Sequence, residues 1–125
     1  AQDHELHDQL GFLNQLAGET QTAAAEYAQA LQADPDDSLA AANLALIEAQ
    51  EHHVAEAVRL WNSVFSRDPV ELGAGLNLAV VQCAAGQREA AVATLNRLLT
   101  FAPDNDRARE MLGALRSGQQ SCAAK

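Results

Sequence analysis

The chain has 125 residues, one domain's worth, and 17 acidic residues against eight Lys or Arg give it a formal net charge of −9. Ala makes up about a fifth of the residues, Leu is frequent and only three Pro occur, a composition that favours helix. The negative charge argues against nucleic acid as a partner. No apolar run approaches the roughly 20 residues that span a bilayer, so membrane insertion is not expected.

The charges are unevenly distributed along the chain. Residues 1–58 contain 11 acidic residues and no Lys or Arg, whereas residues 59–125 contain six acidic and eight basic residues. The first part therefore carries −11 and the second +2, which is 8 − 6. A field of this sign favours basic partners, although an acidic surface is equally compatible with solubility alone.

Three prolines mark an internal repeat. Pro35, Pro69 and Pro103 are each separated by 34 residues. Because Pro cannot donate the backbone hydrogen bond that another helical turn needs, each one indicates that a helix has just ended. Repeats of this length are typical of stacked helical hairpins.

Further residue types recur on the same 34-residue grid. A Leu followed by a small residue comes first, where a larger side chain would separate two crossing helices. An Ala follows, which is also expected where the two helices of a repeat cross. A large apolar residue, expected to fill the space between neighbouring hairpins, comes next. The sets are Leu10, Leu44 and Leu78; Gly11, Ala45 and Ala79; Ala23, Ala57 and Ala91; Tyr27, Trp61 and Leu95; and Ala30, Val64 and Leu98.

This pattern resembles the tetratricopeptide repeat family. The resemblance implies an all-α fold, a right-handed α-solenoid of three antiparallel helix pairs plus one capping helix, seven helices in total. The repeats in chain order are expected at 4–37, 38–71 and 72–105, followed by the capping helix at 106–116 and a flexible tail at 117–125. In each repeat the first helix is expected from about the second to the fourteenth position, and the second from about the eighteenth to the thirtieth.

The turns and caps follow from particular residues. Gly18 and Gly86 lie where the turn inside a hairpin commonly requires a positive φ, whereas the second repeat has His52 there, so we expect that turn to be bent differently. Asp36, Asp37 and Asp104 follow a Pro by one or two positions and are expected to cap the next helices.

The resemblance implies that the first helix of each repeat lines a concave inner wall. Asn43 and Asn77 recur one repeat apart, and because an amide both donates and accepts, they could hold an extended peptide backbone. An alternative is that Asn at this place reflects the repeat pattern alone. Asp8 is expected at the acidic end of this wall. The predicted peptide-binding groove comprises Gln9, Phe12, Leu16, Asn43, Leu46, Gln50, Leu76, Asn77, Val80 and Cys83.

Other chemistry is weakly indicated. His4 and His7 lie three apart beside Glu5 and Asp8 and could hold a divalent metal, but solvated side chains are the commoner outcome near a chain end, so no metal or cofactor is expected. Cys83 is expected to pack as a small apolar residue. Since no nucleophile with a base and an orienting group can be assembled, an enzyme is not expected.

The sequence therefore predicts a module that binds a peptide or protein segment in its concave groove, as part of a longer protein. The partner is expected to be neutral, apolar or basic rather than acidic. The alternative is a structural array that either spaces domains or self-associates through Leu6, Leu10 and Leu13, on a first helix with no predecessor. The many Ala and the single Lys hint at a bacterial source. The compartment stays open.

Overall fold

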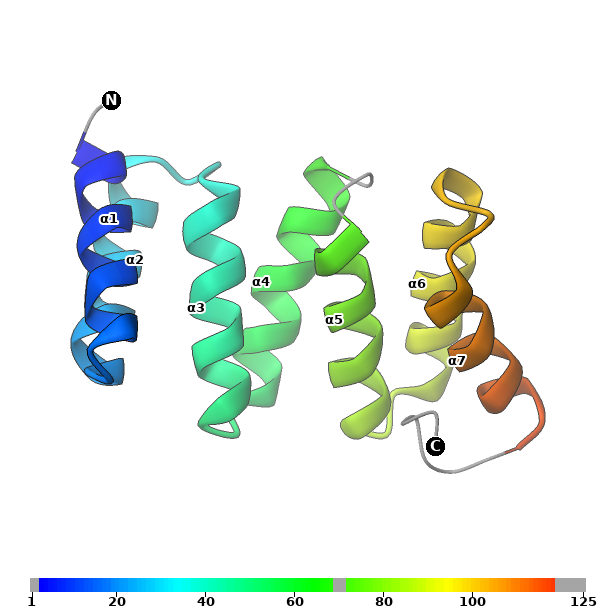
Figure 1. Ribbon diagram of the computed structural model, residues 1–125. Helices are drawn as coiled ribbons and strands as arrows, with labels where there is room; N and C mark the ends of the chain where they lie inside the picture. Colours follow the sequence, from blue (N-terminus) through cyan, green and yellow to red (C-terminus); the bar gives the residue numbers. More distant parts are fainter. Residues whose placement is uncertain (1–2, 69–71, 119–125) are drawn as a thin grey trace.

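The computed structural model describes residues 3–68 and 72–118, and within these ranges it contains seven α-helices and no strand (Figure 1). The prediction of an all-α fold with seven helices is therefore confirmed. The helices are α1 (Asp3–Leu16), α2 (Thr20–Ala33), α3 (Ser38–Gln50), α4 (Val54–Arg67), α5 (Leu72–Ala84), α6 (Arg88–Phe101) and α7 (Asp106–Arg116).

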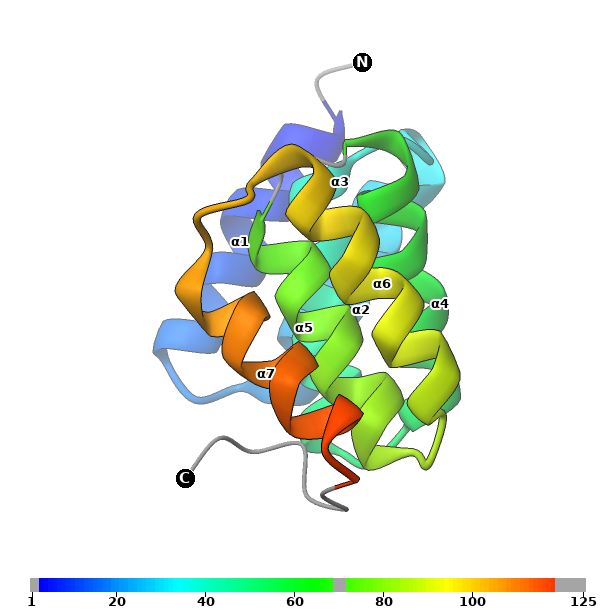
Figure 2. The ribbon, with the colours of Figure 1, turned by 90° about the vertical axis from the view of Figure 1, so that its right-hand side faces the viewer.

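The helices form two rows. In Figure 1 α1, α3 and α5 lie in the front row and α2, α4 and α6 lie behind them. Each front helix packs against the helix that follows it in the chain, and the two form an antiparallel hairpin. The hairpins stack in chain order, with α2 contacting α3 and α4 contacting α5. Figure 2 shows α7 lying across the end of the stack, where it packs on α6. A helix in this place covers the last hairpin, as expected of a cap.

The helix ends lie within one or two residues of the expected positions. The second helices end at Ala33, Arg67 and Phe101, each two residues before a proline of the 34-residue grid. The agreement follows from the restricted backbone of the residue before Pro. Pro69 itself and the expected tail beyond residue 118 lie outside the described residues.

Among the described residues, Asp37 and Asn105 cap helices with their side chains, and of these two only Asp37 was expected from the sequence. Asp37 Oδ1 accepts a hydrogen bond from the backbone N–H of Ala40 at 3.1 Å and caps α3. The prediction for Asp104 was wrong, because α7 begins at Asp106 and the cap is therefore Asn105, which accepts from Ala108 N–H at 2.9 Å. Asp36 lies one residue too early to cap α3.

The three turns inside the hairpins have the same conformation. Gly18 and Gly86 have φ of 79° and 78°, and His52 has φ of 65°. In each turn, the next residue's N–H bonds to a carbonyl five residues earlier, as His53 N–H does to Glu48 O at 2.7 Å. The expectation of a different bend at His52 was therefore wrong. The hydrogen bonds of the turn hold this histidine in a left-handed conformation that costs a non-glycine residue about 1–2 kcal/mol.

The buried core is divided into two clusters. The smaller cluster belongs to the first hairpin and the start of the second, with Tyr27 and Ile47 as its large members. The larger cluster runs from α3 to α7 and contains Trp61, Phe65 and Leu95. Partly buried Leu31 and Leu44 pack against both clusters and connect them. The first hairpin is thus joined to the second through the α3 members of the smaller cluster and through Leu31 and Leu44.

The small residues after Leu lie where the sequence predicts close helix packing. Ala45 and Ala79 are fully buried, and Gly11 lies against the ring of Tyr27. Tyr27 therefore packs within its own hairpin, on α1, rather than only between neighbouring hairpins as expected. Gly113, on the capping helix, has nothing within 4 Å of its missing β-carbon.

Candidate functional site

A pocket of about 360 Å³ opens between the second and third hairpins. Helix α3 contributes one wall, the start of α5 contributes the other, and α4 lies beneath. It is lined by Ser38, Leu39, Ala42, Asn43, Leu46, Trp61, Val64, Gly73, Ala74 and Asn77.

The floor of the pocket is apolar and its polar groups come from amides and one hydroxyl. Trp61 is 2% exposed and Val64 is fully buried, so both side chains belong to the core. They form the base of the pocket. The side chains of Asn43 and Asn77 line the same pocket. An apolar cavity with a few polar groups is the usual composition of a binding site.

No acidic or basic side chain lines this pocket. One cation reaches its margin, because the guanidinium of Arg67 contacts Ser38 Oγ at 3.3 Å. The same group contacts Asp36 Oδ1 at 3.7 Å and Ser63 Oγ at 2.8 Å, so its charge is already partly balanced. The lining therefore has no charge of its own with which to select an acidic ligand.

Asn43 also belongs to the polar contacts of the first hairpin. Burial raises the pKa of Tyr27, the negative charge of Asp8 adds to this, and a hydrogen bond with Asn43 opposes it. The Tyr27 hydroxyl donates in addition to Gln15 Oε1. Asn43 is half-buried, whereas Asn77 is exposed, so Asn77 has its amide more freely available to a ligand.

The other residues predicted for the groove lie in different places. On α1, Gln9 is exposed, Phe12 is 55% exposed and Leu16 is 69% exposed, and none of them lines the pocket. Gln50 is exposed at the end of α3. Asn43, Leu46 and Asn77 thus line one pocket, and the predicted α1 residues do not line it.

Three predicted groove residues on α5 differ in exposure. Val80 is 36% exposed, so it is open to solvent. Leu76 is half-buried and packs against the larger core cluster, so it contributes more to stability than to an open surface. Cys83 is half-buried against the same cluster, as expected of a small apolar residue. Its sulfur is not a free thiol.

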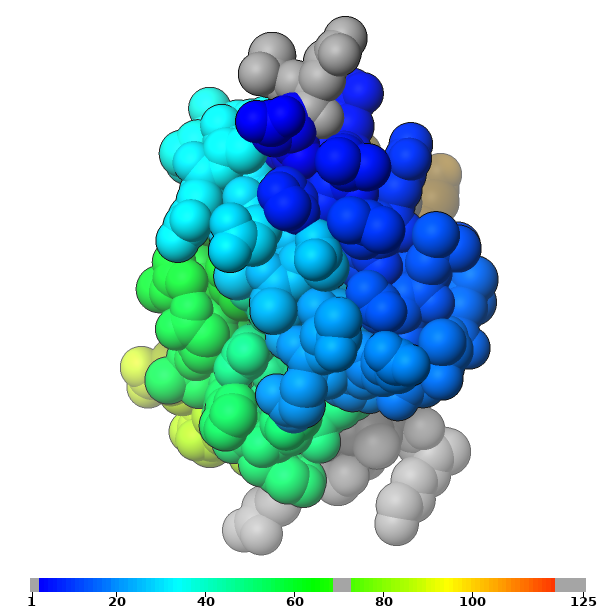
Figure 3. All heavy atoms as spheres, turned by 90° about the vertical axis from the view of Figure 1, so that its left-hand side faces the viewer, coloured from blue at the N-terminus to red at the C-terminus, as the bar shows by residue number. Residues whose placement is uncertain are grey.

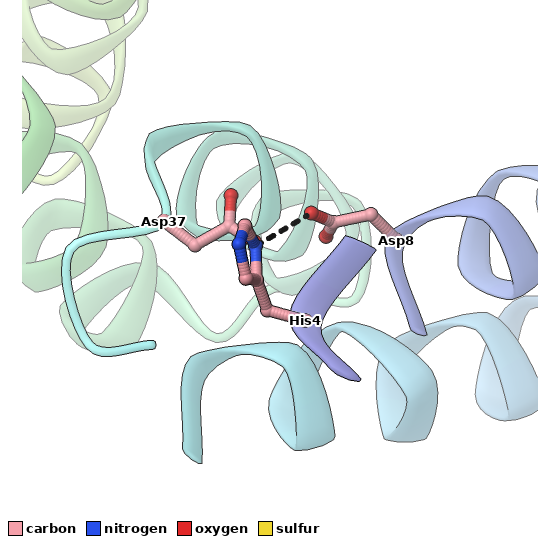
Figure 4. Close-up of side chains that lie close together, drawn as sticks. All are labelled: His4, Asp8 and Asp37. Carbon is pink, nitrogen blue, oxygen red and sulfur yellow. Dashed lines mark hydrogen bonds and ion pairs between the residues drawn. The ribbon is translucent and has the colours of Figure 1, made fainter. Parts of the chain in front are cut away.

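A polar cluster lies at the N-terminal end of the stack (Figure 4). His4 Nδ1 is 2.9 Å from Asp37 Oδ2 and 3.8 Å from Asp8 Oδ2, and His4 Nε2 is 3.9 Å from Asp34 Oδ2. Asp8 and Asp37 are buried, with side chains 8% and 5% exposed. Asp8 therefore lies beneath the surface and is not part of an acidic end of the inner wall, contrary to the prediction.

The electrostatics of this cluster follow from burying two carboxylates together. Burial and the neighbouring Asp37 raise the pKa of Asp8 to about 7. The pKa of Asp37 is lowered, against the opposing effect of burial, because hydrogen bonds from Asp8, Ala40 N–H and His4 stabilise its charge. The hydrogen bond with Asp37 raises the pKa of His4. Asp8 thus holds a proton in a range where an ordinary aspartate has lost it.

Sequence reasoning missed parts of both sites. The 34-residue pattern included Trp61 and Val64 as apolar residues of the second repeat. It did not indicate that the same side chains lie beneath a pocket. Asp37 was expected only as a helix cap, yet it also binds His4. His7, expected beside His4, pairs instead with Glu26 at 2.6 Å. No sequence spacing indicates that Asp37 and His4, 33 residues apart, lie in contact.

A family comparison supports the repeat architecture. A tetratricopeptide repeat model matches residues 48–115, more than half of the chain. The chain belongs to the tetratricopeptide repeat family. No curated protein sequence matches it significantly.

In the part of the chain that the structure describes, none of the helices combines the length and apolar character needed to cross a membrane.

Several solved tetratricopeptide repeat proteins share the fold. A Thermobaculum terrenum O-GlcNAc transferase mutant matches with a TM-score of 0.72 at 26% identity, over 90% of this chain and 22% of the transferase. The first repeat domain of Spaghetti (RPAP3), bound to an HSP90 peptide, matches with 0.79 at 20% identity, over 97% and 98%. The TPR2B domain of yeast Sti1, in a complex with pHsp70, matches with 0.75 at 23% identity, over 94% and 95%. The chain thus spans about a fifth of the transferase and nearly all of the two peptide-bound domains.

Proposed function

We propose that this tetratricopeptide repeat domain is a protein-interaction module whose pocket between α3 and α5 binds a segment of a partner. The single observation that carries the proposal is the uncharged pocket of about 360 Å³, with an apolar floor and two amide side chains at its walls. The peptides bound to the domains of Spaghetti and Sti1 support a peptide as the class of ligand.

The composition of the pocket favours one kind of segment. An apolar side chain of the ligand would occupy the space above Trp61, and the amides of Asn43 and Asn77 would pair with its backbone N–H and C=O groups. Backbone pairing of this kind is independent of sequence, so the apolar side chain would provide the selectivity. A volume of about 360 Å³ is at the small end of ligand pockets and suits one large side chain.

The charges favour a neutral or basic segment over an acidic one. Eleven acidic residues and no Lys or Arg precede Arg59, so the half of the domain that supplies α1, α2 and α3 carries a negative field. An acidic peptide tail would need cations to balance its carboxylates. At the margin of the pocket Arg67 contacts the lining residue Ser38, but it is already paired with Asp36.

Binding of three peptides of equal length would test this proposal by fluorescence anisotropy. One peptide is neutral with a central Leu, one has Lys or Arg on either side of that Leu, and one is acidic. We expect the first two to bind and the acidic one to bind more weakly. Tightest binding by the acidic peptide would contradict the charge preference.

A set of Asn variants then locates the binding site. Asn77→Ala alone, and with Asn43→Ala, should weaken binding by about 1–3 kcal/mol, the cost of leaving a backbone group of the ligand unpaired. Asn62→Ala changes an exposed Asn on α4 outside the pocket and is the matched control. Circular dichroism checks that helicity is unchanged. If affinity were the same in the double variant and the control, the pocket would not be the binding site.

Self-association is a second candidate, favoured by the exposed apolar side of the first hairpin. Figure 3 shows α1 and α2 both at the surface on this side, with no helix packed against them. On α1, Leu6, Leu10 and Leu13 are 55%, 37% and 59% exposed and follow a helical i, i+4, i+7 spacing. An apolar helix face of this kind is normally covered by a preceding repeat or by another chain.

Light scattering over a range of protein and salt concentrations distinguishes the two functions. If the face associates, the mass rises with concentration, and Leu13→Ser restores the monomer. Phe101→Ser, which changes a similarly exposed apolar residue at the end of α6, is the control and should leave the association unchanged. A monomer at every concentration would exclude self-association and leave peptide binding unaffected.

A further inference from the structure

The polar cluster of His4, Asp8 and Asp37 has the composition of a metal site. One imidazole nitrogen and two carboxylate oxygens from these residues all lie within 4.8 Å of one another. His4 and Asp8 are one turn apart on α1, and Asp37 is the cap that precedes α3. Figure 4 shows the three side chains pointing toward one another. Imidazole and carboxylate together are ligands typical of zinc and other divalent transition metals.

The spacing of the ligand atoms suits a small cation. A tetrahedral metal with bonds of about 2.0–2.2 Å holds its ligand atoms about 3.3–3.6 Å apart. His4 Nδ1 is 2.9 Å from Asp37 Oδ2 and 3.8 Å from Asp8 Oδ2, on either side of this range. Small adjustments would therefore bring each carboxylate oxygen to this distance from His4 Nδ1, and all three atoms already lie within 4.8 Å of one another. The second Asp37 oxygen remains bound to Ala40 N–H, which holds the carboxylate in place as an outer hydrogen bond does for metal ligands.

One oxygen of the cluster is buried without a partner. Asp8 is 6% exposed, and its Oδ1 atom has no hydrogen-bond donor among the described residues. A buried polar atom without a partner destabilises the folded state, and this one belongs to a side chain that faces His4 and Asp37. A cation bound by the Asp8 carboxylate would satisfy it.

The charges of the cluster also require a cation or a proton. Two buried carboxylates repel each other unless one is neutralised, and His4 contacts both. A divalent ion bound by both deprotonated carboxylates would balance their charges.

We propose that His4, Asp8 and Asp37 bind one divalent transition-metal ion, such as Zn²⁺, which fastens the first hairpin to the second. The place of the cluster supports this role, because α1 belongs to the first hairpin and Asp37 lies at the start of the second. With three protein ligands, a tetrahedral ion keeps a fourth position for water or another group. The site is independent of the pocket between α3 and α5 and of what that pocket binds.

Calorimetric titration of the EDTA-treated and desalted protein with ZnCl₂ tests the proposal. We expect one zinc per chain and a higher melting temperature in its presence. His4→Gln and Asp8→Asn should each weaken zinc binding at least about tenfold. Asp8→Asn keeps the size of the side chain and imitates its protonated form, so this variant should remain folded, which circular dichroism checks.

His7→Gln is the matched control, because His7 lies on the same helix but pairs with Glu26. It should bind zinc as the unchanged protein does. Equal loss of zinc in His7→Gln and His4→Gln would overturn the site, as would unchanged zinc binding in Asp8→Asn. MgCl₂ and CaCl₂ should bind far more weakly, because these ions prefer oxygen ligands alone, and binding as tight as that of zinc would contradict a role for His4.

Discussion

The ring of Tyr27 lies so close to Gly11 that a β-carbon on Gly11 would come within 2.8 Å of Tyr27 Cε1. The ring is fully buried, and its hydroxyl is tied to Gln15, so it has little freedom to move away. The contact allows α1 and α2 to approach each other closely. It gives a physical reason for glycine where the other repeats have Ala45 and Ala79.

Gly11→Ala should therefore destabilise the protein. Overpacking costs about 1–3 kcal/mol, and the higher helix propensity of Ala returns at most about 1 kcal/mol, so we expect the free energy of unfolding to fall by about 1–2 kcal/mol. Gly113→Ala is the control, because its added methyl group meets nothing within 4 Å, and it should stabilise α7 by about 0.5–1 kcal/mol. Urea unfolding measures both. Opposite signs support the packing argument, and two stabilised variants would contradict it.

His52→Gly should stabilise the turn between α3 and α4. The left-handed conformation costs His about 1–2 kcal/mol, whereas Gly adopts it without steric cost but loses about 0.5–1 kcal/mol of backbone entropy. The expected net gain in the free energy of unfolding is about 0.5–1 kcal/mol.

His53→Gly is the control for this turn. His53 has φ of −87° and contacts Glu48 Oε2 at 2.8 Å, so glycine gains nothing there and removes that contact. Thermal unfolding should show a higher midpoint for His52→Gly and a lower one for His53→Gly. Should His52→Gly lower the midpoint, the turn would not be strained in solution.

The stability of the metal-free protein should fall as pH rises from about 4 to 8. The folded state keeps a proton on Asp8 up to a pKa of about 7, whereas the unfolded chain releases it near 3.8, so the folded state binds more protons across this window. The raised pKa of His4 acts in the same direction, through contacts with Asp37, Asp34 and Glu5. The lowered pKa of Asp37 has its effect below 3.8.

Asp8→Asn tests the part of this dependence that belongs to Asp8. Its amide carries no charge at any pH, so the variant should lose less stability between pH 5 and pH 8, by about 1–3 kcal/mol. Urea unfolding at both pH values, with EDTA present, measures the difference. The dependence that remains belongs to His4 and to groups elsewhere. Equal pH dependence in the two proteins would show that Asp8 is ionised throughout.

The sequence by itself determined the seven helices, their order and the places where they pack closely. These features depend on local preferences and on a constant step of 34 residues, because each repeat contacts only its neighbours. The buried alanines, the ends before each proline and the small residues after Leu all follow from that periodicity.

Only the tertiary structure decided which side chains share a site. The placement of neighbouring hairpins puts Trp61 beneath the pocket, Leu76 against the core and Asp37 against His4. A repeat pattern predicts at most one of the contacts that each of these residues makes. His52 shows the same limit, because hydrogen bonds formed by the whole turn impose a conformation that its residue type disfavours. Periodicity specifies which residues face inward, whereas the contacts between particular side chains depend on packing across the stack.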